Sequence, residues 1–99
     1  MRYYFDWDPN KATANVRKHK IGFDQAAAIF LDQQAVTIFD DEHSEIEDRW
    51  VTIGMDNNSI LLVVVHTFHQ AGEDDCRIRI VSAGKATRRE ANQYRKGTL

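Results

Sequence analysis

Four basic side chains fall at positions where a folded sheet could gather them. Arg49 begins one predicted strand, His66 ends the most apolar one, and Arg77 and Arg79 alternate along the last. An arginine matches a phosphate group with a planar fork of donors and stabilises charge that develops during phosphoryl transfer. A histidine can accept the proton of a ribose 2′-hydroxyl. If these side chains share one open face of the sheet, they form a site that could cleave RNA without a metal.

Each of these residues also has a purely structural interpretation. Arginines on a solvated strand face often pair with acidic neighbours, and such surface pairs contribute little to stability. A histidine within a sheet is commonly a hydrogen-bonded structural residue. Residue types and spacing alone leave both interpretations open.

The segment before Arg49 is strongly acidic, with six carboxylates and His43 between residues 40 and 48. Such oxygen-rich loops can hold a hard divalent cation, but the spacing of an EF-hand is missing, so we expect no metal. Glu45 and Glu47 alternate along the approach to the strand and can reach the face that carries Arg49. Either glutamate could act as a general base or orient the arginine.

The charge of the chain is divided into an acidic body and a basic end. Residues 77–99 hold seven Lys or Arg and one Glu, a net charge of +6, whereas residues 1–76 carry −8. A concentrated cationic end indicates an anionic partner, with phosphate the leading candidate. Lys85, Arg88 and Arg89 surround the start of the last predicted helix, whose backbone N–H groups also attract anions. The alternative is a solvated helix face that keeps the protein in solution.

The elements that must position these residues follow from hydrophobic periodicity and capping signals. Asp8 and Pro9 predict a helix start, an apolar stripe from Phe23 to Leu31 predicts a second helix, and Thr87 with Glu90 forms a capping box. We predict strands at 2–7, 36–39, 49–55 and 76–83. The continuously apolar, β-branched run 60–65 predicts a central strand covered on both sides. The order β-α-α-β-β-β-β-α predicts an α+β fold. We expect an antiparallel four- to five-stranded sheet with its helices packed on one face and the other face partly open.

Length and composition set the remaining expectations. Ninety-nine residues predict a single domain over residues 1–99. The single cysteine, Cys76, leaves no internal disulfide and fits a cytoplasmic protein. The longest apolar run, Ile60–Val65, is far too short to cross a bilayer, so we expect no membrane association.

Several blocks of the sequence resemble the BrnT family. They cover nearly the whole chain, and the first and last are the most specific. The blocks are Phe5-Asp6-Trp7-Asp8-Pro9 with Lys11, Asn15-Val16-Arg17-Lys18-His19, Gly22-Phe23-Asp24-Gln25-Ala26, His43-Ser44-Glu45 with Glu47 and Arg49, Ile53-Gly54, Leu61–His66, Arg79-Ile80-Val81-Ser82-Ala83, and Lys85-Ala86-Thr87-Arg88-Arg89-Glu90 with Tyr94.

The resemblance implies a toxin of a type II toxin–antitoxin module with a compact RelE-like fold. It implies a metal-independent endoribonuclease, without a cofactor, that cuts RNA and arrests translation. The implied partner is a BrnA-like ribbon-helix-helix antitoxin, which forms a hetero-oligomer with the toxin and gives it indirect contact with DNA. The resemblance implies functional roles for Glu47, Arg49, Arg79 and the helix start at Lys85–Glu90.

The chain departs from the family pattern just before the last helix. Gly84 stands where the family usually has an arginine, and Ala91 and Asn92 stand where two basic residues often follow Glu90. The missing arginine removes a phosphate contact, unless Lys85 and Arg88 take its place. The alternative function is therefore a weak or inactive toxin homologue that acts as a protein-binding module and co-repressor. Direct DNA binding is disfavoured because the net charge is −2 and no helix-turn-helix pattern is visible.

Overall fold

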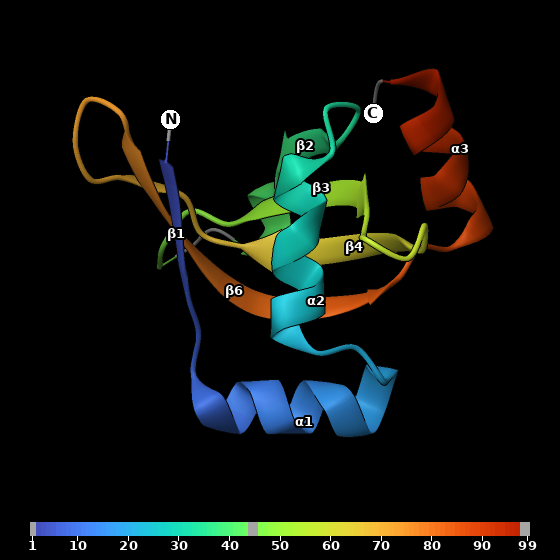
Figure 1. Ribbon diagram of the computed structural model, residues 1–99, viewed down its shortest axis with the longest axis horizontal. Helices are drawn as coiled ribbons and strands as arrows, with labels where there is room; N and C mark the ends of the chain where they lie inside the picture. Colours follow the sequence, from blue (N-terminus) through green and yellow to red (C-terminus); the bar gives the residue numbers. More distant parts are fainter. Residues whose placement is uncertain (1, 44–45, 98–99) are drawn as a thin grey trace.

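The computed structural model describes residues 2–43 and 46–97 (Figure 1). An α+β arrangement packs helical segments against one mixed sheet. In chain order the elements are β1 (Arg2–Asp6), α1 (Pro9–His19), α2 (Phe23–Ala27), the 3₁₀ turn η1 (Ala28–Leu31), β2 (Val36–Phe39), the 3₁₀ turn η2 (Asp41–His43), β3 (Trp50–Met55), β4 (Leu61–His66), β5 (His69–Gln70), β6 (Asp75–Lys85) and α3 (Arg88–Lys96).

The sheet has six strands in the order β1-β6-β4-β3-β2, with β5 pairing to β6. Neighbouring strands from β2 to β6 run antiparallel, which confirms the expected meander. The first strand differs from the expected antiparallel sheet, because β1 pairs with β6 in parallel. A period-two pattern states which residues share a face but not the direction of a partner some 70 residues away, so the sequence could not reveal this pairing.

The helix boundaries follow the capping signals in the sequence. The Asp8 carboxylate accepts a hydrogen bond from the N–H of Asn10 (2.8 Å), and Pro9 occupies the first turn of α1. Lys20 ends that helix in the left-handed conformation at φ 62°. The predicted second helix is α-helical only to Ala27 and then tightens into η1. At α3, both hydrogen bonds of the Thr87–Glu90 capping box are present, as predicted.

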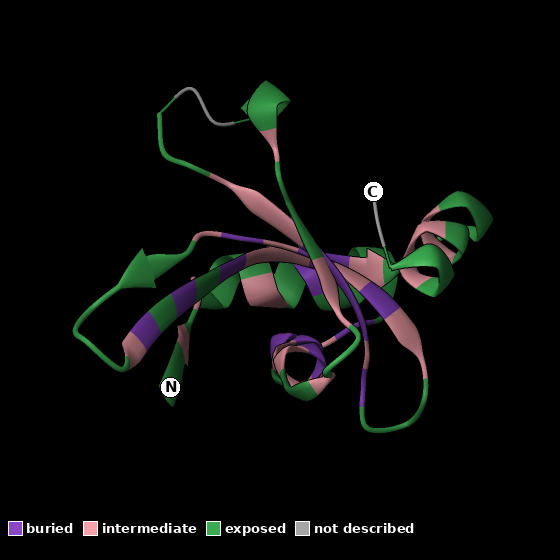
Figure 2. Cartoon of the chain, turned by 90° about the horizontal axis from the view of Figure 1, so that it is seen from above, coloured by how far each residue is buried: buried purple, intermediate pink, exposed green. Residues whose placement is uncertain are grey.

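One face of the sheet carries the core. Buried side chains of α2, η1 and the segment before them pack against buried side chains of β4 and β6, and Figure 2 shows these buried positions alternating along the strands. Strand β4 occupies the predicted central position. Its second face is only half-buried, because Leu62, Val64 and His66 are buried while the residues between them are not. None of the described helices is long and apolar enough to cross a membrane.

Asn15 joins α1 to the part of β6 that extends beyond β1. Its side-chain amide donates to the carbonyl of Ala83 (2.8 Å) and accepts from the N–H of the same residue (3.1 Å). A second donor of the amide reaches the carbonyl of Ile21 (2.9 Å). The buried side chain thus satisfies backbone groups that a neighbouring strand would otherwise pair.

Candidate functional site

Glu47 and Arg49 both line an open pocket of about 440 Å³ just before β3. Glu42, His43 and Ile46 complete its lining, so the acidic loop and η2 form its walls. Figure 2 shows η2 as exposed chain beyond the end of β2. Glu45, the other predicted general base, lies outside the described residues.

Asp40 organises the base of this loop. Its N–H donates to the carbonyl of Arg49 (2.8 Å), which closes the loop across the ends of β2 and β3. Its carboxylate lies 2.9 Å from Nδ1 of His43. Because a carboxylate can only accept here, Nδ1 of His43 carries the proton and Nε2 is left to face other partners. This aspartate–histidine pair was not predicted, although the i, i+3 spacing of the two residues was visible in the sequence.

Arg77 and Arg79 lie on the sheet face opposite the core, as predicted. Both are exposed, whereas Ile78 and Ile80 beside them are buried. The N–H of Thr67 donates to the carbonyl of Arg79 (2.9 Å). The β3–β4 register ends at the pair of Trp50 with His66, and its continuation by one residue places Arg49 across from Thr67. Strands lie about 4.8 Å apart, so the backbones of Arg49 and Arg79 are about 10 Å apart.

A neighbouring strand holds Arg79 in place. Arg79 forms an ion pair with Asp6 on β1 (Nη1 to Oδ1, 3.3 Å), and both side chains remain about half exposed. A solvated pair of this kind is weak, so a phosphate can compete with Asp6 for the guanidinium.

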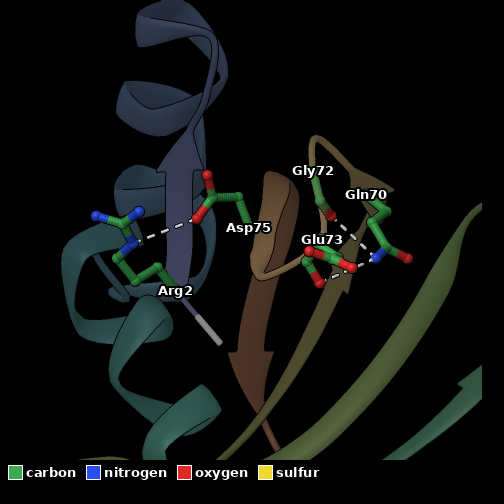
Figure 3. A network of polar contacts seen from close by, with 5 residues as sticks. All are labelled: Arg2, Gln70, Gly72, Glu73 and Asp75. Carbon is green, nitrogen blue, oxygen red and sulfur yellow. Dashed lines mark hydrogen bonds and ion pairs between the residues drawn. The ribbon is translucent and has the colours of Figure 1, made fainter.

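The hairpin that leads into β6 is also braced by polar contacts (Figure 3). Arg2 pairs with Asp75 (3.2 Å), and the Gln70 side chain donates to the carbonyls of Gly72 (3.0 Å) and Glu73 (3.5 Å). These contacts fix the strand just before Arg77.

His66 does not join the arginines, because its side chain enters the core on the other face of the sheet. It is 1 % exposed, and its ring meets Phe30 edge-on at 4.9 Å between centroids. Nδ1 lies 2.9 Å from the carbonyl of Thr67, to which it must donate, so Nε2 accepts from the Thr52 hydroxyl (2.7 Å). Burial lowers the pKa of His66, against the smaller opposing effect of the Thr67 carbonyl. These features favour a structural, neutral histidine.

Lys85, Arg88 and Arg89 lie at the opposite end of β6 from Arg77 and Arg79. Lys85 pairs with Leu62 at the start of β4, six residues beyond Arg79, which corresponds to about 20 Å along a strand. Arg88 and Arg89 line a second open pocket of about 550 Å³ on α3 with Asn92, Gln93 and Lys96. Figure 1 shows α3 at the end of the sheet away from the β5–β6 hairpin. The basic C-terminal region therefore forms two separate cationic surfaces.

Tyr94 fixes the position of α3. Its hydroxyl donates to the Asp32 carboxylate (2.6 Å), which also accepts from the N–H of Met55 (2.8 Å). The hydrogen bond to Asp32, with burial, raises the pKa of Tyr94 to about 12. Burial alone would raise the pKa of Asp32, but hydrogen bonds from Tyr94, Met55 and Gln34 outweigh it and lower that pKa.

Gly84 has room for a side chain. A Cβ at this position would lie 3.5 Å from Nδ1 of His19, which is an ordinary contact distance. The departure from the family pattern is therefore not imposed by packing. Among residues 2–43 and 46–97, no three His, Cys, Asp or Glu side chains gather as a metal site would require.

The fold has a counterpart among known proteins. The solved structure of the Brucella abortus ribonuclease toxin BrnT matches with a TM-score of 0.56 and 17 % sequence identity, over 89 % of this chain and 100 % of that one. The family model of the BrnT ribonuclease toxins of type II toxin–antitoxin systems matches residues 7–90. The chain therefore belongs to the BrnT toxin family. Among curated proteins, none matches the chain.

Proposed function

We propose that this BrnT-family toxin is a metal-independent endoribonuclease whose catalytic centre contains Glu47, Arg49 and Arg79. The observation that carries the proposal is the pocket shared by Glu47 and Arg49, two strands from Arg79 on the open face of the sheet. It combines a carboxylate that can accept a proton with guanidinium groups that can hold a phosphate.

The reaction follows from these groups. Arg49 and Arg79 bind the non-bridging oxygens of the scissile phosphate and stabilise the charge that develops on them. Glu47 accepts the proton of the ribose 2′-hydroxyl, whose oxygen then bonds to phosphorus. The bond from phosphorus to the 5′-oxygen breaks, which gives a 2′,3′-cyclic phosphate and a 5′-hydroxyl end. We do not include His66 in this centre, because its buried ring lies on the other face.

The remaining basic residues extend the RNA-binding surface. Arg77 continues the row of Arg79 along β6, and Lys85, Arg88 and Arg89 provide a second surface about 20 Å away. Two such surfaces can hold a single strand at separate phosphates, and only the first lies beside the pocket of Glu47.

The biological setting follows from the family. We propose that the chain acts in the cytoplasm as a single RelE-like domain, cuts cellular RNA and thereby arrests translation. A BrnA-like ribbon-helix-helix antitoxin would neutralise it in a hetero-oligomer and provide the contact with DNA. Membership of a type II toxin–antitoxin family supports the antitoxin partner and the RNA target.

The proposal is tested with purified protein and RNA in excess EDTA. Wild type should cleave RNA, and Arg49→Ala or Arg79→Ala should lower the rate constant by about 100-fold, the typical effect of removing a group that stabilises transition-state charge. Arg2→Ala is the control for loss of an arginine, because Arg2 forms an ion pair with Asp75 at the start of β6 and is not part of the proposed centre. Cleavage that needs added Mg²⁺, or undiminished activity in both variants, would contradict the proposed centre.

The alternative, an inactive homologue that only binds its partner, rests on Gly84. It predicts that the purified chain binds a BrnA-like antitoxin tightly but leaves RNA intact. The same cleavage assay separates the two functions, because this alternative allows no cleavage by wild type under any condition.

A further inference from the structure

The pocket of Glu47 and Arg49 contains a second group that can transfer a proton. Of the four histidines, all within the described residues, only His43 lines this pocket. His66 is buried in the core, His69 lies on β5 and His19 ends α1. The His43 side chain is 62 % exposed, so its ring is accessible to a bound substrate.

The orientation of His43 is fixed by Asp40. The 2.9 Å contact uses Nδ1, so the Asp40 carboxylate holds the ring with Nε2 turned away from it. Nε2 and its proton are then free of this contact and available to the pocket. Asp40 is held in turn by its backbone hydrogen bond to Arg49, so the pair is tied to the strand end that carries the proposed phosphate ligand.

We propose that His43 is the general acid of the cleavage reaction and that Asp40 positions it. The inference rests on the proposed ribonuclease function. In that reaction, His43 supplies the proton that Glu47 cannot. Glu47, as a carboxylate, can accept the 2′-hydroxyl proton but has none to give to the leaving group. A histidine is the side chain that carries a transferable proton near neutral pH.

The proton and bond changes balance with these two groups. As the 2′-oxygen bonds to phosphorus, its proton passes to Glu47. As the bond from phosphorus to the 5′-oxygen breaks, the proton on Nε2 of His43 passes to that oxygen. The products are a 2′,3′-cyclic phosphate, a 5′-hydroxyl, neutral His43 and protonated Glu47, and exchange with water restores both side chains.

A substrate with a sulfur leaving group tests the role of His43 directly. The linkage cut by wild type is first mapped, and an oligonucleotide is then made with sulfur in place of the bridging 5′-oxygen at that linkage. A thiolate is a far weaker base than an alkoxide and leaves without a general acid. His43→Ala should lose about 100-fold or more on the ordinary linkage but remain within about threefold of wild type on the sulfur linkage.

The other variants separate acid, base and structural effects. Glu47→Gln should lose activity on both linkages, because it removes the proposed base. Asp40→Ala should show a smaller loss than His43→Ala, again relieved by sulfur. His19→Gln is the control for loss of an exposed histidine and should match wild type. His43→Gln keeps a polar side chain without the acid, and thermal unfolding of each variant shows whether a loss of activity comes from a loss of stability.

The outcomes distinguish this proposal from the one on which it rests. Equal losses of His43→Ala and His43→Gln on both linkages, or no loss on either, would overturn the role of His43 and leave the ribonuclease function standing. If wild-type protein cleaves neither linkage, the ribonuclease function itself fails, and the role of His43 fails with it.

Discussion

At the scale of residues, the four histidines have very different environments. His66 donates to Thr67 and accepts from Thr52, whose hydroxyl in turn accepts from Thr37 (2.8 Å). This chain crosses three neighbouring strands, from the buried His66 to the exposed Thr37 on the edge strand β2, and it requires a neutral ring. The residue type that suits acid–base chemistry thus serves packing at position 66, whereas the exposed ring at position 43 faces a polar pocket.

The buried His66 predicts a stability that depends on pH. Because burial lowers the pKa of His66 in the folded state, the unfolded chain binds a proton first as pH falls. This contribution is constant above about pH 6.5, the pKa of an unperturbed histidine, and stability falls as pH drops below that value. Urea unfolding of wild type and His66→Gln at pH 7.5 and pH 5 measures it. We expect wild type to lose more stability between these pH values than the variant, and equal losses would contradict the prediction.

At the scale of elements, α3 depends on a few polar contacts. None of the residues of α3 is buried, and the helix is held by its capping box and by the hydrogen bond from Tyr94 to Asp32. This bond links the C-terminal helix to the end of η1 and, through Met55, to the end of β3. The cationic surface of Arg88 and Arg89 is therefore presented by an element with little apolar packing.

Tyr94→Phe should lower the free energy of unfolding by roughly 1.5–3 kcal/mol, the usual contribution of a hydrogen bond to a charged group. The pKa of Tyr94 is raised to about 12 in the folded protein, so its contribution is complete below the pKa of about 10 of a free tyrosine. The contribution is lost as pH rises from about 10 to about 12. Urea unfolding at pH 8 and pH 11 should show a smaller alkaline loss in Tyr94→Phe than in wild type. The same loss in both proteins would contradict this contribution.

At the scale of the whole molecule, the charge division becomes two cationic surfaces on one acidic body. Arg49, Arg77 and Arg79 lie toward one end of the sheet, and Lys85 with Arg88 and Arg89 lies toward the other. An overall charge of −2 gives little general attraction for RNA, so binding must depend on these local surfaces.

The salt dependence of RNA affinity counts these contacts. Each phosphate contact to a single strand contributes a slope of about −0.7, so six cations predict about −4 in log affinity against log salt. Changing Lys85, Arg88 and Arg89 together to alanine should reduce the slope to about −2, while saturating RNA is still cleaved at nearly the wild-type rate. Fluorescence anisotropy with a 2′-O-methyl oligonucleotide, which lacks the attacking hydroxyl, measures the affinity. An unchanged slope would show that the surface of Lys85, Arg88 and Arg89 does not contact RNA.

The sequence by itself determined the local structure and the family. Asp8-Pro9 and the Thr87–Glu90 capping box located helix starts correctly because capping acts between residues a few positions apart. Alternation along β6 also placed Arg77 and Arg79 opposite the core, since side chains of a strand point to opposite faces in turn. The charge division and the resemblance to BrnT toxins needed no structure.

Only the tertiary structure decided which of these residues meet. His66 continues the alternation of Leu62 and Val64 into the core, and the register shift between Val65 and His66 places Ile80 opposite it, so Arg79 lies on the other face. The length of β6 separated Arg79 from Lys85, although both belong to one basic stretch of sequence. The hydrogen bond from the N–H of Asp40 to the carbonyl of Arg49 closes the loop, and this closure places His43 in the pocket with Glu47 and Arg49. Such contacts depend on pairing between distant segments, and a period of two or 3.6 carries no information about that pairing.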